Sequence, residues 1–391
     1  MTPWPTARLH TLRPAVQRES ECASSRGQGS LPFVVLRRSW ATAIATAAIT
    51  GCGYYDSSLL EAAASATDAG GSTDSGACTS ERPPGPPSVK DAGGGAEIVV
   101  ALKTVDFHES SGSNTIGYDL DNTCTCLGQG PSCVAPKDSP GSCDGPGGRD
   151  NSGAALIQAS AMLGLTSGTF TQDIAEGDFS LLLRIREYNG LADDDQVSVA
   201  WLVPLTLMKP PAFDGTDVWG INGSCLHHDQ NGQPNLEDPI IIDPLAYVTG
   251  GRLVASLKGG APLNVSAQFS IVVHTAFLSG NLVKQGALWE IQDGVVCGIW
   301  RTDDLFANLR NTDVLGSPLC TNNPAYPNVK ATICRSRDIS AQSMNPADPC
   351  DAISLAFTFT AYPAQINVAW DPPAPVNPCA AAVDPANDTC D

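Results

Sequence analysis

Short runs of apolar residues, some alternating with polar ones, recur along the chain from about residue 97 onward. Each run has the length of a strand, and a period of two is typical of a strand with one buried face. The runs expected to form strands are 97–102, 179–186, 196–203, 252–257, 269–278, 288–291 and 352–359. Turn dipeptides such as Asn189-Gly190 and Gly250-Gly251 lie between some of them, as in β-hairpins.

Helical patterns are fewer. The segments 152–163, 302–309 and 328–334 are expected to be helices, and the second begins with Asp303 and Asp304, which favour the N-terminal end of the helix dipole. Many strands with a few helical insertions favour a mainly β fold over a parallel α/β fold. We therefore predict a two-sheet β-sandwich, jelly-roll-like, with a disulfide-rich loop.

The N-terminal region contains a short apolar stretch, 40–49, which follows Arg37 and Arg38. It is shorter than the roughly 20 residues that span a bilayer, but it has the size of a signal-peptide core. The residues Ile49-Thr50-Gly51-Cys52 follow, and this order resembles the lipobox of bacterial lipoproteins over about residues 35–52. A short buried helix with an incidental cysteine is the alternative.

The resemblance implies that 1–51 is a removed signal peptide and that Cys52 carries a lipid. The part before the apolar stretch is unusually long, which a mis-assigned start codon would explain if translation truly begins near Val34 or Val35. The mature protein would be exported and lipid-anchored to a membrane of the cell envelope, facing the periplasm or the cell surface. Residues 52–96 are expected to be a disordered tether, 97–371 a β-rich domain, and 372–391 a tail rich in Pro and Cys.

The charge balance excludes several partners. The chain has 22 basic and 41 acidic residues, a formal net charge of −19. A nucleic-acid-binding protein needs a basic face, and so does a protein that adheres to anionic lipid through a polybasic patch. We therefore expect no nucleic-acid partner, and contact with the membrane only through the lipid on Cys52.

The chain has 14 cysteines and no CxxC pair, which indicates disulfides in an oxidising compartment. Cys124, Cys126, Cys133 and Cys143 lie in a segment rich in Gly, Pro and Ser, and we expect these four to form disulfides among themselves, with the pairing unassigned. A thiolate zinc site is the less favoured alternative. Cys379 and Cys390 are predicted to pair with each other, and Cys78 is expected to clamp the tether onto the domain.

Acidic segments bracket the cysteine-rich loop and suggest a calcium site. Asp119 and Asp121 precede the loop, and Asp150 and Asn151 follow it, so cysteines that pinch the loop would bring their oxygens together. Hard oxygen ligands are what Ca²⁺ prefers. Arg149 is the alternative, because its guanidinium could neutralise the same carboxylates without a metal.

A weaker calcium candidate is the segment 229–237, in which oxygen-bearing residues alternate from Asp229 and Asn231 onward. It resembles the start of an EF-hand loop but has Pro234 where that loop needs glycine. Polar residues that cap turns are the alternative for both candidates. Among the aromatic residues, Trp219 lies in a turn-rich segment and is the best candidate for an exposed sugar-stacking side chain, although burial in the core is equally consistent.

No nucleophile elbow, zinc-protease helix, Walker loop or dinucleotide fingerprint occurs in the chain. A non-catalytic surface binding module for a carbohydrate or another envelope component, stabilised by calcium, fits these features best. A secreted hydrolase of a polysaccharide and a purely structural envelope lipoprotein are the alternatives, and whether the chain is an enzyme stays open.

Overall fold

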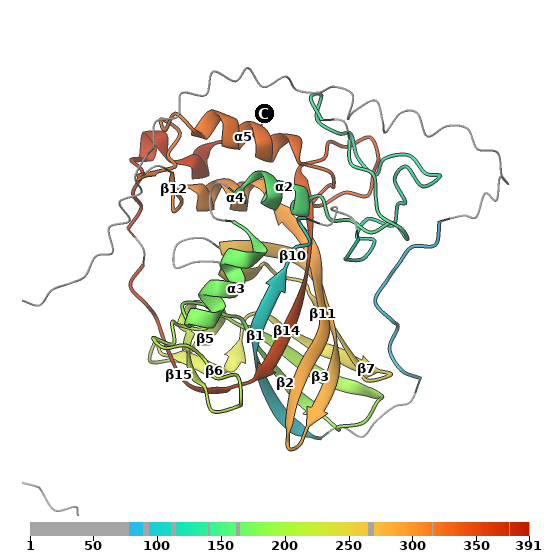
Figure 1. The fold of residues 1–391 in the computed structure, drawn as a ribbon, viewed down its shortest axis with the longest axis vertical. Helices are drawn as coiled ribbons and strands as arrows, with labels where there is room; N and C mark the ends of the chain where they lie inside the picture. Colours follow the sequence, from blue (N-terminus) through green and yellow to red (C-terminus); the bar gives the residue numbers. More distant parts are fainter. Residues whose placement is uncertain are drawn as a thin grey trace, which may run out of the picture. The chain divides into compact units, whose positions relative to one another are not determined.

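Eight antiparallel strands close into a β-barrel in the computed structural model of this chain (Figure 1). The neighbour order is β11-β14-β1-β2-β3-β7-β8-β10, and β10 pairs again with β11. The structure describes residues 78–88, 94–110, 115–139, 141–161, 165–264, 270–314, 316–374 and 376–390. The predicted two-sheet sandwich is therefore wrong, because the first and last strands of the sheet pair with each other.

The barrel strands are β1 (Ala96–Asp106), β2 (Leu182–Tyr188), β3 (Asp194–Leu202), β7 (Ile242–Thr249), β8 (Arg252–Leu257), β10 (Ser270–Gln285), β11 (Leu288–Arg301) and β14 (Ala352–Pro363). Smaller pairs are β4 (Val218–Asn222) with β15 (Gln365–Trp370), β5 (Leu226–His228) with β6 (Pro234–Pro239), and β12 (Asp313–Val314) with β13 (Ser317–Pro318). Strand β9 (Ala261–Asn264) pairs with β10. The helices are α2 (Gly153–Ala159), α3 (Ser167–Glu176), α4 (Thr302–Leu309) and α5 (Tyr326–Arg335), with 3₁₀ turns η2 (Gly223–Cys225), η3 (Ala381–Val383) and η4 (Pro385–Asn387).

Closure of the barrel depends on the long hairpin of β10 and β11. The hydrophobic pattern predicted strands only over 269–278 and 288–291, so it missed about half of this hairpin. These strands have 16 and 14 residues, and Gly286 with a φ of +64° lies in the tight turn between them. Their register shifts twice, between His274 and Phe277 and between Ser279 and Asn281. Such bulges increase the bend and twist of a strand, and a closed barrel requires both.

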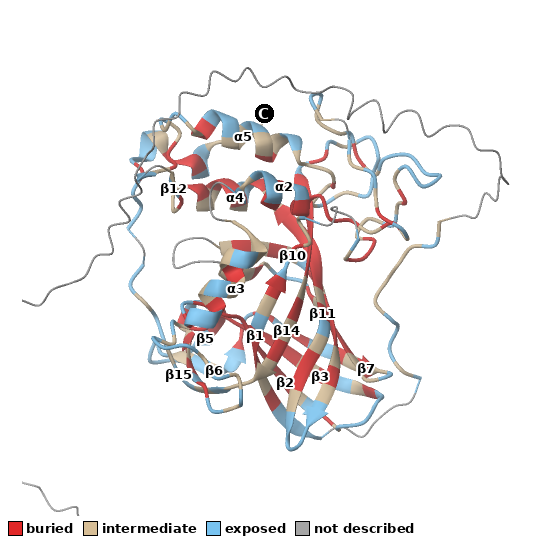
Figure 2. Cartoon of the chain, in the orientation of Figure 1, coloured by how far each residue is buried: buried red, intermediate tan, exposed pale blue. Residues whose placement is uncertain are grey.

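Alternate residues of the barrel strands form the main apolar core. Leu183 and Ile185 of β2 belong to this core, whereas Leu182 belongs to a second cluster on the other face of the sheet, which the β4–β15 pair covers. Both faces are buried along much of β14, as Figure 2 shows by burial colours. A strand that is buried on both faces reads as a continuous apolar run, so its sequence does not distinguish a barrel from a sandwich.

The helices lie mostly near one end of the barrel, where α2, α4 and α5 are neighbours (Figure 1). Helix α4 spans the predicted range, and α2 and α5 lie at the other predicted positions. Helix α3 was not predicted, because its first residues, Ser, Gly and Thr, are weak helix formers. The side chain of Thr166 caps this helix by accepting from the N–H of Thr169. None of the helices among the described residues is long and apolar enough to cross a bilayer.

Five disulfides staple the described part of the chain. They join Cys78–Cys124, Cys126–Cys143, Cys133–Cys350, Cys320–Cys379 and Cys334–Cys390. The predicted pairing of Cys379 with Cys390 is wrong, because each bonds instead to a cysteine of the segment around α5. The expected clamp through Cys78 is confirmed. Of the four loop cysteines, only Cys126 and Cys143 pair with each other; the prediction is wrong for Cys124 and Cys133, whose partners lie outside the loop. Cys225 and Cys297 are buried thiols without a disulfide.

Candidate metal centre

Asp119, Asp121 and Asp150 converge on one point. Each offers a carboxylate oxygen, and these oxygens lie within 4.8 Å of one another. The side chain of Asp119 is fully buried and that of Asp150 nearly so. The structure thus brings together three of the residues that the sequence analysis singled out.

Backbone pairing of two segments holds the three carboxylates in place. The N–H of Asp150 donates to the carbonyl of Tyr118 (3.2 Å), and the N–H of Leu120 donates to Oδ2 of Asp150 (2.7 Å). The disulfide Cys126–Cys143 closes the loop between the two segments, as expected. Because this geometry is fixed by backbone and disulfide bonds, the carboxylates cannot move far apart.

Two further carboxylates, Asp144 and Asp338, extend the group, and sequence reasoning missed both. The N–H of Thr125 donates to Oδ2 of Asp144 (2.6 Å), and the N–H and Oγ–H of Ser354 donate to Asp338 (2.8 and 2.5 Å). Asp144 follows a cysteine that forms a loop disulfide, which was a usable signal. Nothing near Asp338 in the sequence indicated its place. We call Asp119, Asp121, Asp144, Asp150 and Asp338 the acidic centre.

Burial and mutual repulsion raise pKa values in the acidic centre. The pKa of Asp150 rises to about 10, first because the group is buried and then because Asp121, Asp144 and Asp338 repel its negative charge. Burial likewise raises the pKa of Asp144 to about 7 and that of Asp338 to about 6. The pKa of Asp121 is also raised, chiefly by burial. The surroundings of the acidic centre therefore disfavour simultaneous ionisation of its carboxyl groups.

One oxygen of the acidic centre has no hydrogen-bond donor. Oδ1 of Asp119 accepts from the N–H of Asn122 (2.7 Å), but Oδ2 of the same carboxylate is buried without a partner. Asn151, the fourth predicted ligand, uses its side-chain oxygen to accept from the N–H of Ala356 in β14 (2.8 Å). An unpartnered buried carboxylate oxygen is costly, so a cation at this point would offset a real free-energy penalty.

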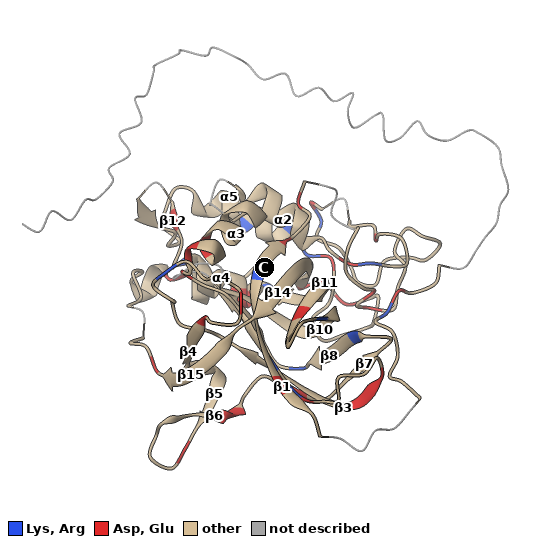
Figure 3. Cartoon of the chain, turned by 60° about the horizontal axis from the view of Figure 1, so that its bottom comes forward, with Lys and Arg blue, Asp and Glu red and all other residues tan. Residues whose placement is uncertain are grey.

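The two nearby arginines have different partners. Arg149, the expected counter-ion, lies 2.5 Å from a carboxylate oxygen of Glu81 and donates to the carbonyl of Thr115 (3.3 Å). Arg82 instead places Nη2 3.9 Å from Oδ1 of Asp119. The basic group that faces the acidic centre is therefore Arg82. Lys and Arg positions elsewhere are scattered among the Asp and Glu positions (Figure 3).

Arg82 belongs to residues 78–88, which we call the strap, and which lie inside the predicted tether. The strap is attached at several points: the N–H of Glu81 donates to the carbonyl of Gly147 (2.7 Å), and the N–H of Asp119 donates to that of Glu81 (3.0 Å). The hydroxyl of Tyr247 donates to the carbonyl of Pro84 (2.6 Å). A Cβ on Gly147 would lie 2.9 Å from the Cβ of Glu81, so glycine permits this close approach. The strap is thus part of the domain.

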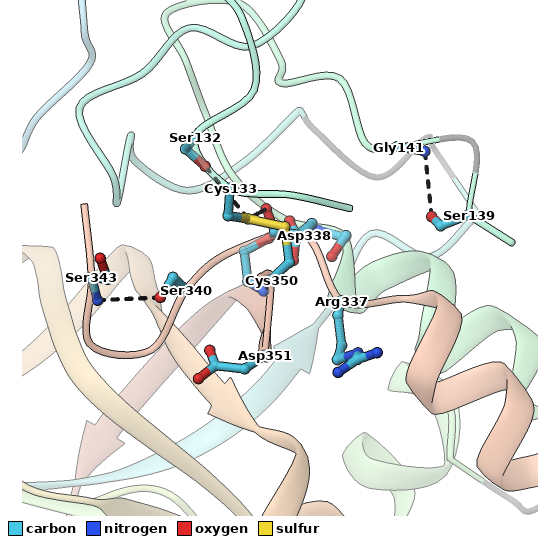
Figure 4. The surroundings of a disulfide bond; sticks show 12 residues. Ser132, Cys133, Ser139, Gly141, Arg337, Asp338, Ser340, Ser343, Cys350 and Asp351 are labelled. Atoms are coloured by element: carbon cyan, nitrogen blue, oxygen red, sulfur yellow. Dashed lines mark hydrogen bonds between the residues drawn. A yellow bond between two sulfur atoms is a disulfide. The ribbon is translucent and has the colours of Figure 1, made fainter. Parts of the chain in front are cut away.

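A cleft of about 510 Å³ adjoins the acidic centre. Its lining includes Asp338, Ser132 and Lys137 and the disulfides Cys126–Cys143 and Cys133–Cys350. Figure 4 shows Asp338 beside the second of these disulfides. Among the described residues that line the cleft, Asp338 is the only carboxylate and none is aromatic. The cleft is therefore of mixed polarity, since Pro, Ala and half-cystine residues line it beside Ser, Thr and Gln, and two disulfides stiffen its walls.

The second calcium candidate is a hairpin turn. Oδ1 of Asp229 accepts from the N–H groups of Asn231 (2.8 Å) and Gln233 (2.9 Å), and the N–H of Asp229 donates to the carbonyl of Gln233 (2.8 Å). These bonds lower the pKa of the exposed Asp229. The oxygens that were expected to alternate as ligands close the turn between β5 and β6.

Trp219 is fully buried and packs in the cluster between the barrel and the β4–β15 pair. The expectation that it is an exposed, ligand-stacking side chain is therefore wrong. The turn-rich sequence before it misled the prediction, because Trp219 is the second residue of β4 and not part of the turn. Trp370 of β15 is the tryptophan of this region with half of its side-chain surface exposed.

No family model, curated protein or solved structure that we compared matches this chain.

Proposed function

We propose that this chain is an exported, lipid-anchored protein of the cell envelope, a non-catalytic binding module that Ca²⁺ stabilises at the acidic centre. The observation that carries the calcium proposal is Oδ2 of Asp119. This oxygen is buried, has no donor, and belongs to a group of three converging carboxylates.

The donor chemistry of the acidic centre supports calcium over transition metals. Its ligands are carboxylates, and Ca²⁺ takes six to eight oxygen ligands in flexible geometry, including water and backbone carbonyls. Cys124 lies close by but forms a disulfide, so it offers no thiolate. Burial and, after it, repulsion by neighbouring carboxylates raise the pKa of Asp150, and a divalent cation would relieve the repulsion.

Export and anchoring rest on the sequence signal and on the oxidised cysteines. Residues 1–77 lie outside the described residues, so the signal peptide, the lipid on Cys52 and most of the tether stay proposals. The five disulfides support an oxidising compartment, since such bonds are rare in a reducing cytosol. Intact-mass measurement of the membrane fraction tests the anchor, and an unmodified Cys52 would contradict it.

The number of carboxyl groups in the cleft favours a binding module over a hydrolase. A glycoside hydrolase commonly flanks its substrate with two carboxyl groups. The described lining of the cleft contains one, Asp338, whose oxygens already accept from Ser354. A cleft of mixed polarity beside a cation suits an envelope component that has both hydroxyl groups and apolar faces, such as a carbohydrate, and the purely structural protein is the alternative if nothing binds there.

Calorimetric titration of the chelator-treated protein with CaCl₂ tests the calcium proposal. We expect saturable binding and a melting temperature several degrees higher in millimolar Ca²⁺ than in chelator, because a ligand that binds the folded state stabilises it. Asp121→Asn should remove both effects, whereas Asp229→Asn, which alters an exposed turn carboxylate, should keep them. Equal melting temperatures with and without Ca²⁺ in the unaltered protein would overturn the proposal.

A further inference from the structure

The strap brings a positive charge to the proposed calcium site. Arg82 has about one third of its side chain exposed, and its Nη2 lies 3.9 Å from Oδ1 of the fully buried Asp119. The same guanidinium hydrogen-bonds the side-chain oxygen of Asn122, and its Nε donates to Oγ of Ser80 (3.1 Å). These contacts aim the guanidinium at the acidic centre.

The position of Arg82 is set by the backbone of the strap. Glu81, its neighbour, is hydrogen-bonded through its N–H to Gly147 and through its carbonyl to the N–H of Asp119. The disulfide Cys78–Cys124 fixes the strap a few residues earlier. Arg82 is therefore a fixed feature of the folded domain and not a chance surface contact.

We propose that Arg82 is a built-in competitor of the calcium ion: its guanidinium and Ca²⁺ neutralise the same carboxylate, Asp119, so that the contact of the Arg82 side chain with Asp119 and the binding of calcium oppose each other. This inference rests on the proposed calcium site and adds its regulation. Like charges repel, so an ion bound at Asp119 must either displace the guanidinium or bind more weakly beside it.

The chain offers a matched control for this effect. Arg149 is also basic and also contacts the strap, but its guanidinium lies 2.5 Å from Glu81 and not against the acidic centre. Neutralising Arg149 changes the net charge of the protein as much as neutralising Arg82 does. Only the neutralisation of Arg82 removes a positive charge from the side of Asp119.

Calcium titration of the full chain, with its disulfides intact, tests the inference. We expect Arg82→Gln and Arg82→Met to tighten calcium binding about three- to tenfold, which is the size of effect that a partly exposed charge at this separation produces. Arg82→Lys, which keeps the charge, and Arg149→Gln should each stay within about twofold of the unaltered protein.

The outcomes separate this inference from the proposed function. If the unaltered protein binds Ca²⁺ but Arg82→Gln and Arg82→Met bind it with the same affinity, the competition is overturned and the calcium site stands. If Arg82→Gln and Arg149→Gln tighten binding equally, general charge explains the effect and the competition is again overturned. If neither the unaltered protein nor the Arg82 variants bind Ca²⁺, both proposals are overturned.

Discussion

The Sγ atom of Cys133 lies 3.2 Å from the backbone carbonyl oxygen of Asp338. Cys133 is bonded to Cys350, which is 217 positions away in the sequence, so this disulfide fixes the segment of Asp338 against the cysteine-rich loop. The disulfide therefore has two roles: it stabilises the fold, and it places one carboxylate of the acidic centre.

Replacing Cys133 and Cys350 together by alanine should lower the free energy of unfolding by about 3–5 kcal/mol, because a very long loop is no longer closed in the unfolded chain. Calcium affinity should also fall, since the position of Asp338 is no longer fixed. Urea denaturation and calcium titration measure the two effects. The double variant Cys320→Ala with Cys379→Ala is the control, and an equal loss of calcium affinity there would contradict the second role.

In chelator, the protein should be more stable at pH 5 than at pH 8. The pKa of Asp144 is raised to about 7 in the folded state, from an ordinary value of 3.8, so the folded state holds a proton that the unfolded state has released. Stability from such a group is present at low pH and is lost as the pH rises through the folded-state value. We expect about 1–2 kcal/mol from Asp144, which is partly exposed.

Urea denaturation at both pH values, with and without Asp144→Asn, measures this contribution. The variant cannot titrate at position 144, so its stability should change less between pH 5 and pH 8. An unchanged pH dependence in the variant would assign the effect to other groups, such as Asp150 and Asp338.

Trp219→Ala should cost about 3–5 kcal/mol of folding free energy, because the side chain is fully buried between the barrel and the β4–β15 pair. Trp370→Ala, at a half-exposed tryptophan of the same pair, should cost clearly less. Thermal or urea unfolding checks both. Similar costs for the two variants would show that Trp219 is not a core residue.

Gly298→Ala should destabilise the barrel by about 1–3 kcal/mol or more. A Cβ at this position of β11 would lie 2.7 Å from the carbonyl oxygen of His274 and 3.0 Å from the Cα of Ala276, which are backbone atoms that cannot yield easily. Gly259→Ala is the control, because no atom lies within 4 Å of the Cβ it would add. If urea unfolding finds Gly298→Ala as stable as the control, β10 and β11 are less closely packed than the structure indicates.

Local features of the fold were predictable from the sequence. Helix α4 begins at Thr302 because acidic residues fill its first turn, and Gly250-Gly251 forms the tight turn between β7 and β8, with both residues at positive φ. Each of these depends on neighbouring residues only. Closure of the barrel depends instead on the pairing of β11 with both β10 and β14, and no local pattern encodes which strands meet.

Only the part of the acidic centre that depends on residues close in the sequence could be predicted. Asp119, Asp121 and Asp150 flank one loop, so cysteines within that loop were enough to suggest that they converge. Asp338 arrives from a distant part of the chain. The composition of the segment around Arg82 predicted disorder. The backbone hydrogen bond from Glu81 to Gly147 orders this segment, and amino-acid composition cannot predict such a contact.

The disulfides around the acidic centre also make its geometry depend on the redox state of the protein. Cys78–Cys124, Cys126–Cys143 and Cys133–Cys350 each join a segment of the acidic centre or of the strap to another part of the chain. While these six thiols are reduced, nothing covalent holds the carboxylates together. Reduction of the folded protein would therefore leave the converging carboxylates held by backbone and side-chain hydrogen bonds alone, so the geometry of the acidic centre is tied to an oxidising compartment.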